Sequence, residues 1–475
     1  MISYIIKKEA MEVSRDGRTR LLAIVMLLLG LTGLLAGWAN YADQQRNALF
    51  AQEDDQTVFL DQGERNPHSA AHFGRMAYKP ASPLAAFDPG AAPFMGQVIW
   101  LEAHQRNPAM FRPAADSLEL GRLSNFSVAG ILTVLLPLLV FLLGYSALAG
   151  ERERGTLRQT LAAGTSTGKL FAAKYIVIAS TGIVLAAVTI IASAVMALFS
   201  PVALSAMDTL VRALGLTAFY ALYVLALTGF ALLVSTLCKQ SRTALLVLLG
   251  IWAVAVMVLP RVGASVAAQT FPIPDGAQVW SELRADIASN RVAPDSAEYK
   301  AAEQFVVSRA LGRDVSLAEL ATMDLNASGL RLEVTEVLDY AVLNNFYADI
   351  YDRYAGQRDV RRWFALLSPA IALQHASSAF AGTDFVAHQH FSDVAEVQRN
   401  NIVRVMNEDL LLNGAGATTY LAGENFWEEV PEFTYQFPPV SVAWRSAAFD
   451  ILLLLLWGAI ATALAWTVTR NRPTV

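Results

Sequence analysis

The chain has 475 residues, of which 55% are hydrophobic and only 16% are charged, with a formal net charge of −5. An ordinary globular protein has about 25% charged residues, so this composition excludes a disordered chain and argues against a typical soluble enzyme. The single cysteine excludes a disulfide framework and a zinc site built from cysteines. Residues 40–125 and 261–445 are as polar as ordinary soluble protein, so the apolar residues must be concentrated in the other segments.

Six segments are long and apolar enough to be transmembrane helices, since a bilayer core about 30 Å thick requires about 20 apolar residues in a helix. These segments contain almost no charged residues, and six of them are hard to reconcile with the core of a soluble protein. The first segment could also be a signal peptide, because the basic residues Arg15, Arg18 and Arg20 precede its apolar run. It is long for one, and Gly37–Ala39 matches a cleavage site poorly, so we interpret it as a retained span. In chain order the predicted spans are 21–39, 126–149, 171–199, 211–237, 243–260 and 446–469.

The distribution of charge predicts the orientation, because Lys and Arg concentrate in the cytoplasmic loops of membrane proteins. With both termini inside, the basic residues fall in the inner segments, whereas the short outer loop 200–210 holds Asp208 and no base. Residues 261–445 contain 24 acidic and 14 basic residues, and residues 40–125 contain 10 and 7. The rest of the chain contains 7 acidic and 15 basic residues. The modest net charge therefore conceals an acidic outside and a basic inside.

The two long outward segments differ in pattern. Prolines interrupt residues 40–125, which are predicted to be loop-like with short helices at 43–54 and 94–104. Residues 261–445 show apolar residues at helical spacing. The apolar stretch 363–380 is interrupted by Pro369 and has two possible interpretations. It could form a pair of helices at the membrane interface, or it could be part of the core of the outer domain. Helices are predicted at 278–290, 296–311, 317–323, 330–354 and 393–412, with Asp295 and Ser316 as caps of the second and third.

These elements predict an all-α membrane protein. It has six transmembrane helices, both termini inside, and a largely helical extracytoplasmic domain at 261–445.

The inner loop 150–170 contains a near match to a phosphate-binding loop, whose pattern is G-x4-G-K-[ST] between a strand and a helix. Ala163 replaces the first glycine, and Leu170 replaces the hydroxyl residue that holds magnesium. Predicted transmembrane helices flank the loop on both sides. We therefore expect that the chain itself binds no ATP.

The first half of this loop, Glu151–Leu157, is predicted to be a short charged helix followed by a second helical turn. One interpretation is a solvated connector rich in ion pairs. The other is a docking element, because a membrane protein without its own energy source must receive work through its cytoplasmic face.

The loop resembles the coupling loop of type-2 ABC exporter permeases, whose pattern is Glu-Arg-Glu-x-Gly-Thr-Leu followed by Gly-Lys before the next span. The six-span order around it agrees with this family. The matching positions, with Arg154 at the variable one, are Glu151, Arg152, Glu153, Gly155, Thr156, Leu157, Gly168 and Lys169.

This resemblance implies several further features. Residues 1–20, with Ile5 and Val13 among charges, resemble the amphipathic elbow helix that lies along the inner membrane surface. The loop would dock a separate ABC ATPase, which binds the ATP and magnesium, so no cofactor is expected on this chain. A second permease chain, identical or paralogous, would complete the transporter.

The large outward insertion resembles a subgroup of these permeases through Ser368-Pro369 and Gly382-Thr383-Asp384. That subgroup is related to the permease used in copper-site maturation of nitrous-oxide reductase. Imidazole and carboxylate groups suit divalent transition metals. The candidate ligands are His388 and His390 near Asp384 and Asp393, and the i,i+4 pair His68 and His72. No cysteine or methionine-rich cluster accompanies them, and histidines are common without a metal, so we predict no metal site.

Catalytic interpretations find little support in the sequence. A proton-coupled transporter or an intramembrane enzyme needs polar groups at membrane depth. Only Lys174, Arg212 and Asp450 approach the membrane, each near a span end where we expect the charge to reach water. The acidic cluster around Trp427 (Glu424, Glu428, Glu429 and Glu432) is interpreted as a solvated face. We therefore expect no catalytic site.

Together these observations predict a multi-pass permease subunit of an ABC exporter in the bacterial inner membrane. Spans with so few charges would give a transport path with apolar walls, which suggests an amphipathic or lipid-linked substrate. Membrane lipid and another envelope protein are further expected partners, and nucleic acid is not. The alternatives are an ATPase-coupled mechanotransmitter or assembly scaffold and, third, a membrane-bound enzyme or metal-handling protein. A cavity joining the spans to the outer domain would favour transport, whereas convergence of the outer histidines and acids would favour the third.

Overall fold

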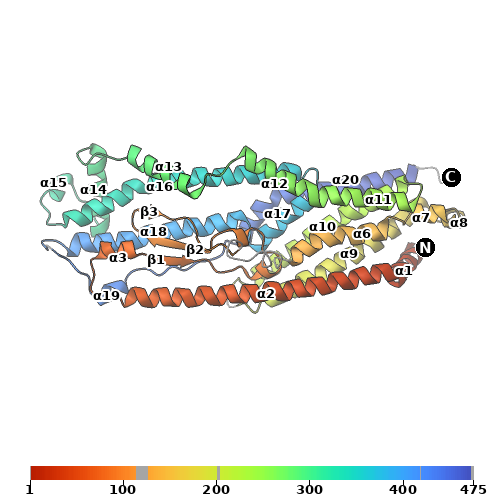
Figure 1. Cartoon of the computed structure of the whole chain (residues 1–475), viewed down its shortest axis with the longest axis horizontal. Coiled ribbons are helices and arrows are strands. Elements are labelled where there is room, and N and C mark those ends of the chain that lie inside the picture. The colour runs from red at the N-terminus through yellow and green to blue at the C-terminus, as the bar shows by residue number, and fades with distance from the viewer. Residues whose placement is uncertain (1, 114–126, 201–203, 418, 472–475) are drawn as a thin grey trace.

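The computed structural model describes residues 2–113, 127–200, 204–417 and 419–471. The molecule is an elongated helical bundle with both termini, α7 and α8 at one end and α14 and α15 at the other (Figure 1). The all-α membrane fold class is confirmed. In the described part, six helical segments are long and apolar enough to cross a membrane. These segments are Gly17–Leu60, Val128–Glu153, Thr167–Ala197, Ala206–Leu237, Ser241–Thr270 and Val440–Asn471.

The N-terminal region forms two helices, α1 (Ile2–Arg15) and α2 (Gly17–Leu60), rather than one amphipathic helix over 1–20. Asp16 separates them and caps α2, since its carboxylate accepts a hydrogen bond from the backbone N–H of Thr19 at 3.0 Å. The first span does not end at residue 39, and the helix predicted at 43–54 is its continuation. No Gly or Pro interrupts residues 38–60, so the helix extends into the outer domain without a break.

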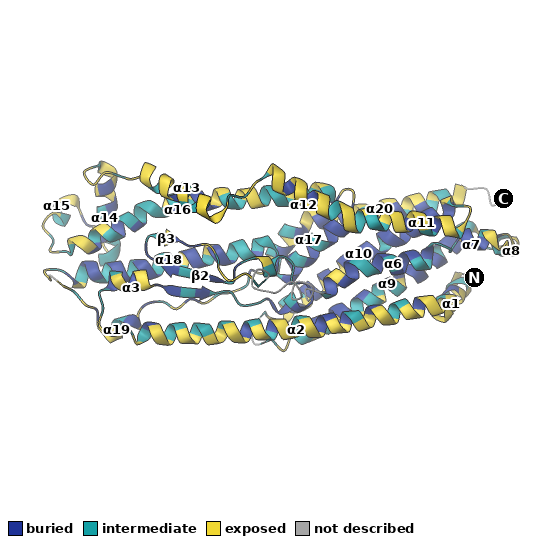
Figure 2. Ribbon diagram, viewed as in Figure 1, coloured by how far each residue is buried: buried dark blue, intermediate teal, exposed yellow. Residues whose placement is uncertain are grey.

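Four helices form the centre of the bundle: α6 (Val128–Gly144), α9 (Thr167–Ala197), α10 (Ala206–Leu237) and α20 (Val440–Asn471). The second span continues through a turn into α7 (Ala149–Glu153). Helix α10 packs against α6, α9 and α20 and contributes many buried residues to the shared core (Figure 2). The predicted boundary at 125–126 and part of the outer loop, 201–203, lie outside the described residues.

The fifth span is longer than the predicted 243–260. It runs through α11 (Ser241–Trp252), a π-helical segment η3 (Ala253–Val258) and α12 (Leu259–Thr270). Pro260 is tolerated because it stands in the first turn of α12, where the hydrogen-bond pattern of the helix changes. The hydroxyl of Ser368 donates a hydrogen bond to the carbonyl of Ala255 in η3 at 2.6 Å. One residue of the Ser368-Pro369 pair therefore stabilises the irregular part of this span.

The second outward segment is helical, as predicted, although its helices differ in extent. Ser296, rather than Asp295, caps α14, and Ser316 caps α15. Helices α16 and α18 are longer than predicted and form the long axis of the outer domain (Figure 1). The helices are α13 (Gly276–Ser289), α14 (Ala297–Leu311), α15 (Leu317–Leu320), α16 (Ala327–Phe364), α17 (Pro369–Ala381), α18 (Phe385–Asn413) and α19 (Glu424–Trp427).

The first outward segment contains a small antiparallel sheet, so the helix predicted at 94–104 is wrong. The sequence VIWLE at 98–102 is rich in β-branched and aromatic residues and forms the central strand. The sheet packs against α18, and Trp427 belongs to the same core. The elements are α3 (Pro67–Phe73), β1 (Arg75–Tyr78), η1 (Pro83–Ala86), η2 (Ala92–Phe94), β2 (Val98–Glu102) and β3 (Gln105–Arg106), with strand order β1-β2-β3.

Helix α17 resolves the two alternatives for residues 363–380. It packs against α10 and α20 and belongs to the core shared with the spans. The ring of Phe380 is fully buried and meets Phe219 and Trp444 at centroid distances of 4.7 and 4.8 Å. Residues 369–380 therefore belong to a buried core helix that joins the outer domain to the spans, whereas Trp363, Leu366 and Leu367 before it are exposed.

Candidate functional site

The loop Glu151–Leu157 forms α7 and the start of α8 (Thr156–Ala162), as the sequence predicts. Gly155 separates the two helices with a φ of 72°, a left-handed conformation that costs glycine little and other residues more. Both helices lie at the same end of the bundle as the two chain termini (Figure 1). The loop is therefore a compact pair of short helices.

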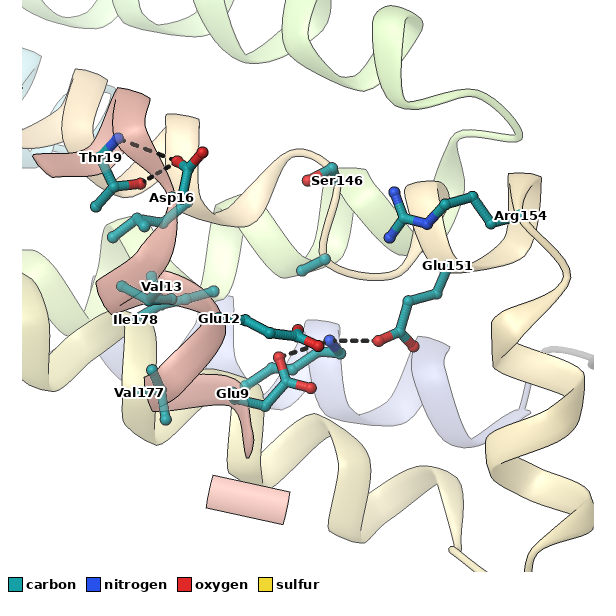
Figure 3. A pocket seen from close by; sticks show the side chains of 13 residues that line it. Glu9, Glu12, Val13, Asp16, Thr19, Ser146, Glu151, Arg154, Val177 and Ile178 are labelled. Carbon is teal, nitrogen blue, oxygen red and sulfur yellow. Dashed lines mark hydrogen bonds and ion pairs between the residues drawn. The ribbon is translucent and has the colours of Figure 1, made fainter. Parts of the chain in front are cut away.

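A buried ion triad holds α7 to the N-terminal helix and the third span. The ammonium group of Lys174 on α9 donates to carboxylate oxygens of Glu9 and Glu151, each at 2.8 Å. The three residues are only 4%, 7% and 5% exposed, respectively. Figure 3 shows Glu9 and Glu151 projecting toward each other from separate elements. Because an unpaired buried charge is strongly unfavourable, the triad fixes α1, α7 and α9 relative to one another.

The surroundings of the triad contain further acidic side chains. They form a pocket of about 160 Å³ that is also lined by Glu12, Asp16 and Arg154 (Figure 3). Lys8 lies 3.2 Å from a carboxylate oxygen of Glu9. Partial burial lowers the pKa of Lys8, but the charge of Glu9 and a hydrogen bond with Glu12 outweigh this effect and raise it. A second cation thus balances the two carboxylates.

The expectation that Lys174, Arg212 and Asp450 reach water is wrong. Arg212 is 3% exposed and Asp450 is 0% exposed. The guanidinium of Arg212 contacts Asp208 at 2.6 Å and donates to two backbone carbonyls, while Asp450 accepts from Arg362 at 3.1 Å. Most of these partners come from segments far away in the sequence, which is why inspection of each span alone does not reveal them.

Arg152 and Glu153 tie α7 to the junction of the fourth and fifth spans. The guanidinium of Arg152 donates to the carbonyl oxygens of Cys238 at 2.8 Å and Thr236 at 3.3 Å, at the C-terminus of α10. The Glu153 carboxylate accepts from the backbone N–H of Ser241 at 3.1 Å and from its hydroxyl at 2.6 Å, at the start of α11. Both contacts provide hydrogen-bond partners for backbone groups at helix ends that have no partner within their own helix.

Some of the other residues of the loop are packed inside the protein, and others are exposed. Leu157 packs with Leu148 and Leu170, and the hydroxyl of Thr156 donates to the carbonyl of Glu151. A Cβ at Gly168 would lie 2.9 Å from the ring of Trp466, so a glycine is needed for α20 to pack against the start of α9. Besides Glu153 and Gly155, the exposed residues of the loop are Arg154, Arg158, Gln159, Ala162, Ala163, Gly164, Ser166 and Lys169. These eight residues, called the exposed loop face below, are available to a partner.

The structure does not bring the predicted metal candidates His388, His390 and Asp384 together. Asp384 caps α18 and accepts from Ser446 at 3.0 Å, and His390 lies beside the hydroxyl of Tyr435. Burial and the positive charge of Lys79 lower the pKa of His388 to about 3. These three positions therefore have separate local roles.

The pair His68 and His72 instead meets His104, which the sequence analysis did not group with them. Their candidate ligand atoms all lie within 4.8 Å of one another, the only such group of three in the described residues. Glu336 lies behind His104, 2.8 Å from its Nδ1. Burial raises the pKa of Glu336, but the hydrogen bond with His104 and the charge of Arg399 outweigh this effect and lower it to about 2. Sequence spacing carries no signal for His104, because tertiary packing brings its loop to α3.

A second pocket, of about 550 Å³, lies where the outer ends of the spans meet the outer domain. Thr133 and Tyr220 line it from the spans, and Arg358 and Arg361 line it from α16. Burial lowers the pKa of Arg361, and no acidic side chain in the described residues lies within ion-pairing distance of it. Burial also raises the pKa of Asp88 in the same wall. The pocket thus has a mixed apolar and polar lining, which includes Asp88 and Asp384, and contains the Arg361 guanidinium without an ion-pair partner among the described residues.

Comparison with known proteins agrees with this architecture. A family model described as ABC-2 family transporter protein matches residues 3–469, from α1 to the last turn of α20. No curated protein matches the sequence.

The ion triad leads to a stability prediction. Lys174→Met removes the buried ammonium group from between two buried carboxylates, which the half-exposed Lys8 balances only in part, so we expect destabilisation by about 3–5 kcal/mol. The melting temperature in detergent should fall, and trypsin should cleave α1 faster. The exposed Lys169→Met, at the start of the same helix, serves as the matched control and should melt like the unmodified chain. The neutral triple variant Glu9→Gln, Glu151→Gln, Lys174→Met should recover most of the loss, and equal melting of Lys174→Met and Lys169→Met would contradict the assignment.

Proposed function

Because the chain belongs to the ABC-2 family of transporter proteins, and so is a multi-pass ABC permease, we propose that it takes its energy from a separate ATPase. This ATPase subunit would bind ATP and magnesium and dock on the exposed loop face. The proposed direction is export, from the inner membrane of a bacterium. The relation to the copper-processing subgroup remains a sequence prediction.

The observation that carries this proposal is the way the loop is anchored. Glu151, Arg152 and Glu153 face the chain itself and contact α9, α10 and α11. Arg158 and Gln159 are exposed on the start of α8. A displacement applied to the outward side would therefore reach three spans together through buried charges and helix-end hydrogen bonds. Rigid-body movement of packed helices is a common way to transmit such a change.

The outer pocket supports transport of an amphipathic, anionic substrate. Tyr220 and Thr133 of the spans and Phe94 of the outer segment would contact an apolar portion, and Arg361 would pair with an acidic headgroup. A charge buried without a partner is unfavourable, so an anion from outside the chain would stabilise Arg361. The pocket contacts both the spans and the outer domain, which is the location the transport interpretation requires.

A mechanotransmitter is the second candidate, and the length of α2 favours it. This helix has 44 residues and passes without interruption from the inner end of the bundle into the outer domain. At about 1.5 Å per residue it is about 66 Å long, enough to carry a movement to a partner in the envelope. Binding of a substrate in the outer pocket distinguishes the two candidates, since only transport requires it.

A second permease chain is proposed to cover the fifth span. Only 11% of the apolar window of Ser241–Thr270 is buried, against 61% for Ala206–Leu237. Figure 2 shows the exposed character of α11 and α12. Helix interfaces in membranes favour small residues, and Gly250 has no heavy atom within 4 Å of its Cβ position. A two-fold pair of chains would bury this side of the helix.

The docking proposal predicts the effect of a charge reversal on the exposed loop face. Arg158→Glu should reduce the ATPase activity that co-purifies with the tagged chain by about tenfold or more, because like charges facing across an interface cost several kcal/mol. Arg284→Glu, an exposed arginine of α13 in the outer domain, is the matched control and should leave the activity unchanged. Equal ATPase activity with the two variants would sink the docking proposal.

The dimer proposal is tested by cross-linking, which the single cysteine makes simple. In a Cys238→Ser background, single cysteines replace Leu246, Gly250 or Val254, which are all exposed on α11 and η3. At least one should form a disulfide-linked dimer on mild oxidation in membranes. Ile191→Cys on the exposed side of α9 is the control. Cross-linking that is no stronger in the fifth span than at Ile191 would point to lipid, not a second chain, on this face.

The substrate proposal predicts selective binding of an anionic amphiphile. Dodecyl phosphate should raise the melting temperature of the purified chain more than uncharged dodecyl maltoside does. Arg361→Met should weaken this binding by about tenfold, since a charge-assisted hydrogen bond contributes about 1.5–3 kcal/mol. Arg353→Met, an exposed position on the same helix, should not weaken it. Equal effects of the two amphiphiles, or of the two variants, would remove the anionic pocket from the proposal.

A further inference from the structure

Three histidines of the outer domain converge from two separate elements. His68 and His72 lie on α3, four residues apart and therefore on one face of the helix. His104 lies between β2 and β3 with a positive φ of 63°, which is uncommon for a residue with a side chain. The three ring centroids lie 4.7, 5.1 and 5.2 Å apart.

Hydrogen bonds fix the tautomers of two of these rings. His68 Nδ1 lies 2.9 Å from the side-chain oxygen of Asn407, and the amide nitrogen of Asn407 donates to Glu333 at 3.0 Å. The amide orientation is therefore set, and Nδ1 of His68 must donate. His104 Nδ1 lies 2.8 Å from Glu336, which also accepts the backbone N–H of His104 at 2.6 Å. In its neutral form, each ring therefore carries its proton on Nδ1 and presents the Nε2 lone pair.

The two Nε2 atoms face each other at 3.3 Å. Two lone pairs at this distance repel unless a proton or a cation lies between them. Zinc binds histidine nitrogen at about 2.0–2.1 Å with tetrahedral angles, which places two ligand nitrogens about 3.3–3.4 Å apart. The observed separation therefore equals that of two imidazoles on one tetrahedral ion.

The residues that hydrogen-bond to Nδ1 of these rings resemble those that orient metal-binding histidines in known sites. Glu336 is 2% exposed and Asn407 is 0% exposed, so neither can rearrange into solvent. Arg399 donates to the second oxygen of Glu336 at 3.1 Å and holds its carboxylate in place. A carboxylate or amide oxygen on the far nitrogen of a ligating histidine orients the ring and increases its basicity. The positive φ of His104 is maintained by the same carboxylate, and strained residues of this kind persist where the surroundings hold them.

We propose that His68, His72 and His104 bind one divalent transition-metal ion, Zn²⁺, through three imidazole nitrogens. Three neutral imidazoles without a thiolate suit Zn²⁺ better than Cu⁺, which prefers sulfur ligands. His72 is exposed, so the fourth position of the tetrahedron faces solvent and is available to water or to a ligand. The ion would join α3 and the β2–β3 turn to Glu336 of α16 and Asn407 of α18.

This inference goes beyond the proposed transport function and does not depend on it. It also replaces the expectation from the sequence that no metal binds, because that expectation considered His68 and His72 without His104. The third ligand and the two orienting residues become visible only in the folded chain. A histidine cluster held by hydrogen bonds alone is the competing explanation, and it predicts no selective binding of metal.

Metal binding to the purified full-length chain tests the proposal. After removal of metal with a chelator and dialysis, the chain in detergent is titrated with Zn²⁺ against a chromogenic competitor. We expect one tightly bound Zn²⁺ per chain. Loss of an outer ligand weakens metal sites about 10- to 100-fold, so loss of a direct ligand in His72→Ala should weaken binding at least about tenfold. Because His72 is exposed, this variant should fold normally.

His390→Ala is the matched control, since His390 is another histidine of the outer domain and its Nδ1 lies beside the hydroxyl of Tyr435 rather than beside the three clustered histidines. It should bind Zn²⁺ like the unmodified chain. Titration with Co²⁺ gives a second readout, because tetrahedral coordination produces intense visible absorption that His72→Ala should lose. Absence of Zn²⁺ binding, or equal affinity in His72→Ala and the unmodified chain, would overturn the proposal whatever the outcome of the ATPase experiments.

Discussion

The inner end of this permease depends on one constraint, which is that a buried ammonium group must have carboxylates beside it. Lys174 satisfies this requirement with Glu9 and Glu151, which come from the N-terminal helix and from the loop after the second span. Removing any member would leave a charge in a low-dielectric environment. The positions of α1, α7 and α9 are therefore coupled, and the buried Glu151 holds α7 so that Arg158 of the next helix stays exposed.

The outer ends of the spans follow the same rule. Arg212 contacts Asp208 and the carbonyls of Phe380 and Pro438, and Asp450 contacts Arg362 and His375. These interactions attach α17 and the end of α16 to the fourth and sixth spans. If α7 receives a movement as proposed, packed helices would connect it to the outer pocket, which is lined by both the spans and the outer domain. Such continuity is what a coupled transporter needs, and it is equally suited to mechanical transmission.

Much of the fold could be predicted from the sequence, because the relevant signals are local. Apolar run length defined the six spans, and Ser316 before an apolar helix marked a cap that the structure contains. The motif Glu151–Leu157 indicated two helical turns, which are α7 and α8. The failures lay where local patterns were ambiguous. The segment around VIWLE had enough apolar residues for a helix, yet pairing with β1 makes it a strand, and nothing local marked an end to α2 at residue 39.

The sequence by itself determined the membrane class, the number of spans, the charge asymmetry and the resemblance of the inner loop to the family pattern, since these follow from composition and short-range spacing. Only the tertiary structure decided which charges meet. Glu151 was visible as a motif residue, but its partner Lys174 and the third member Glu9 were not, and His104 was not visible as a neighbour of His68. The physical reason is that ion pairs and ligand sets depend on distances in space. Those distances arise from helix packing between segments that are far apart in the sequence.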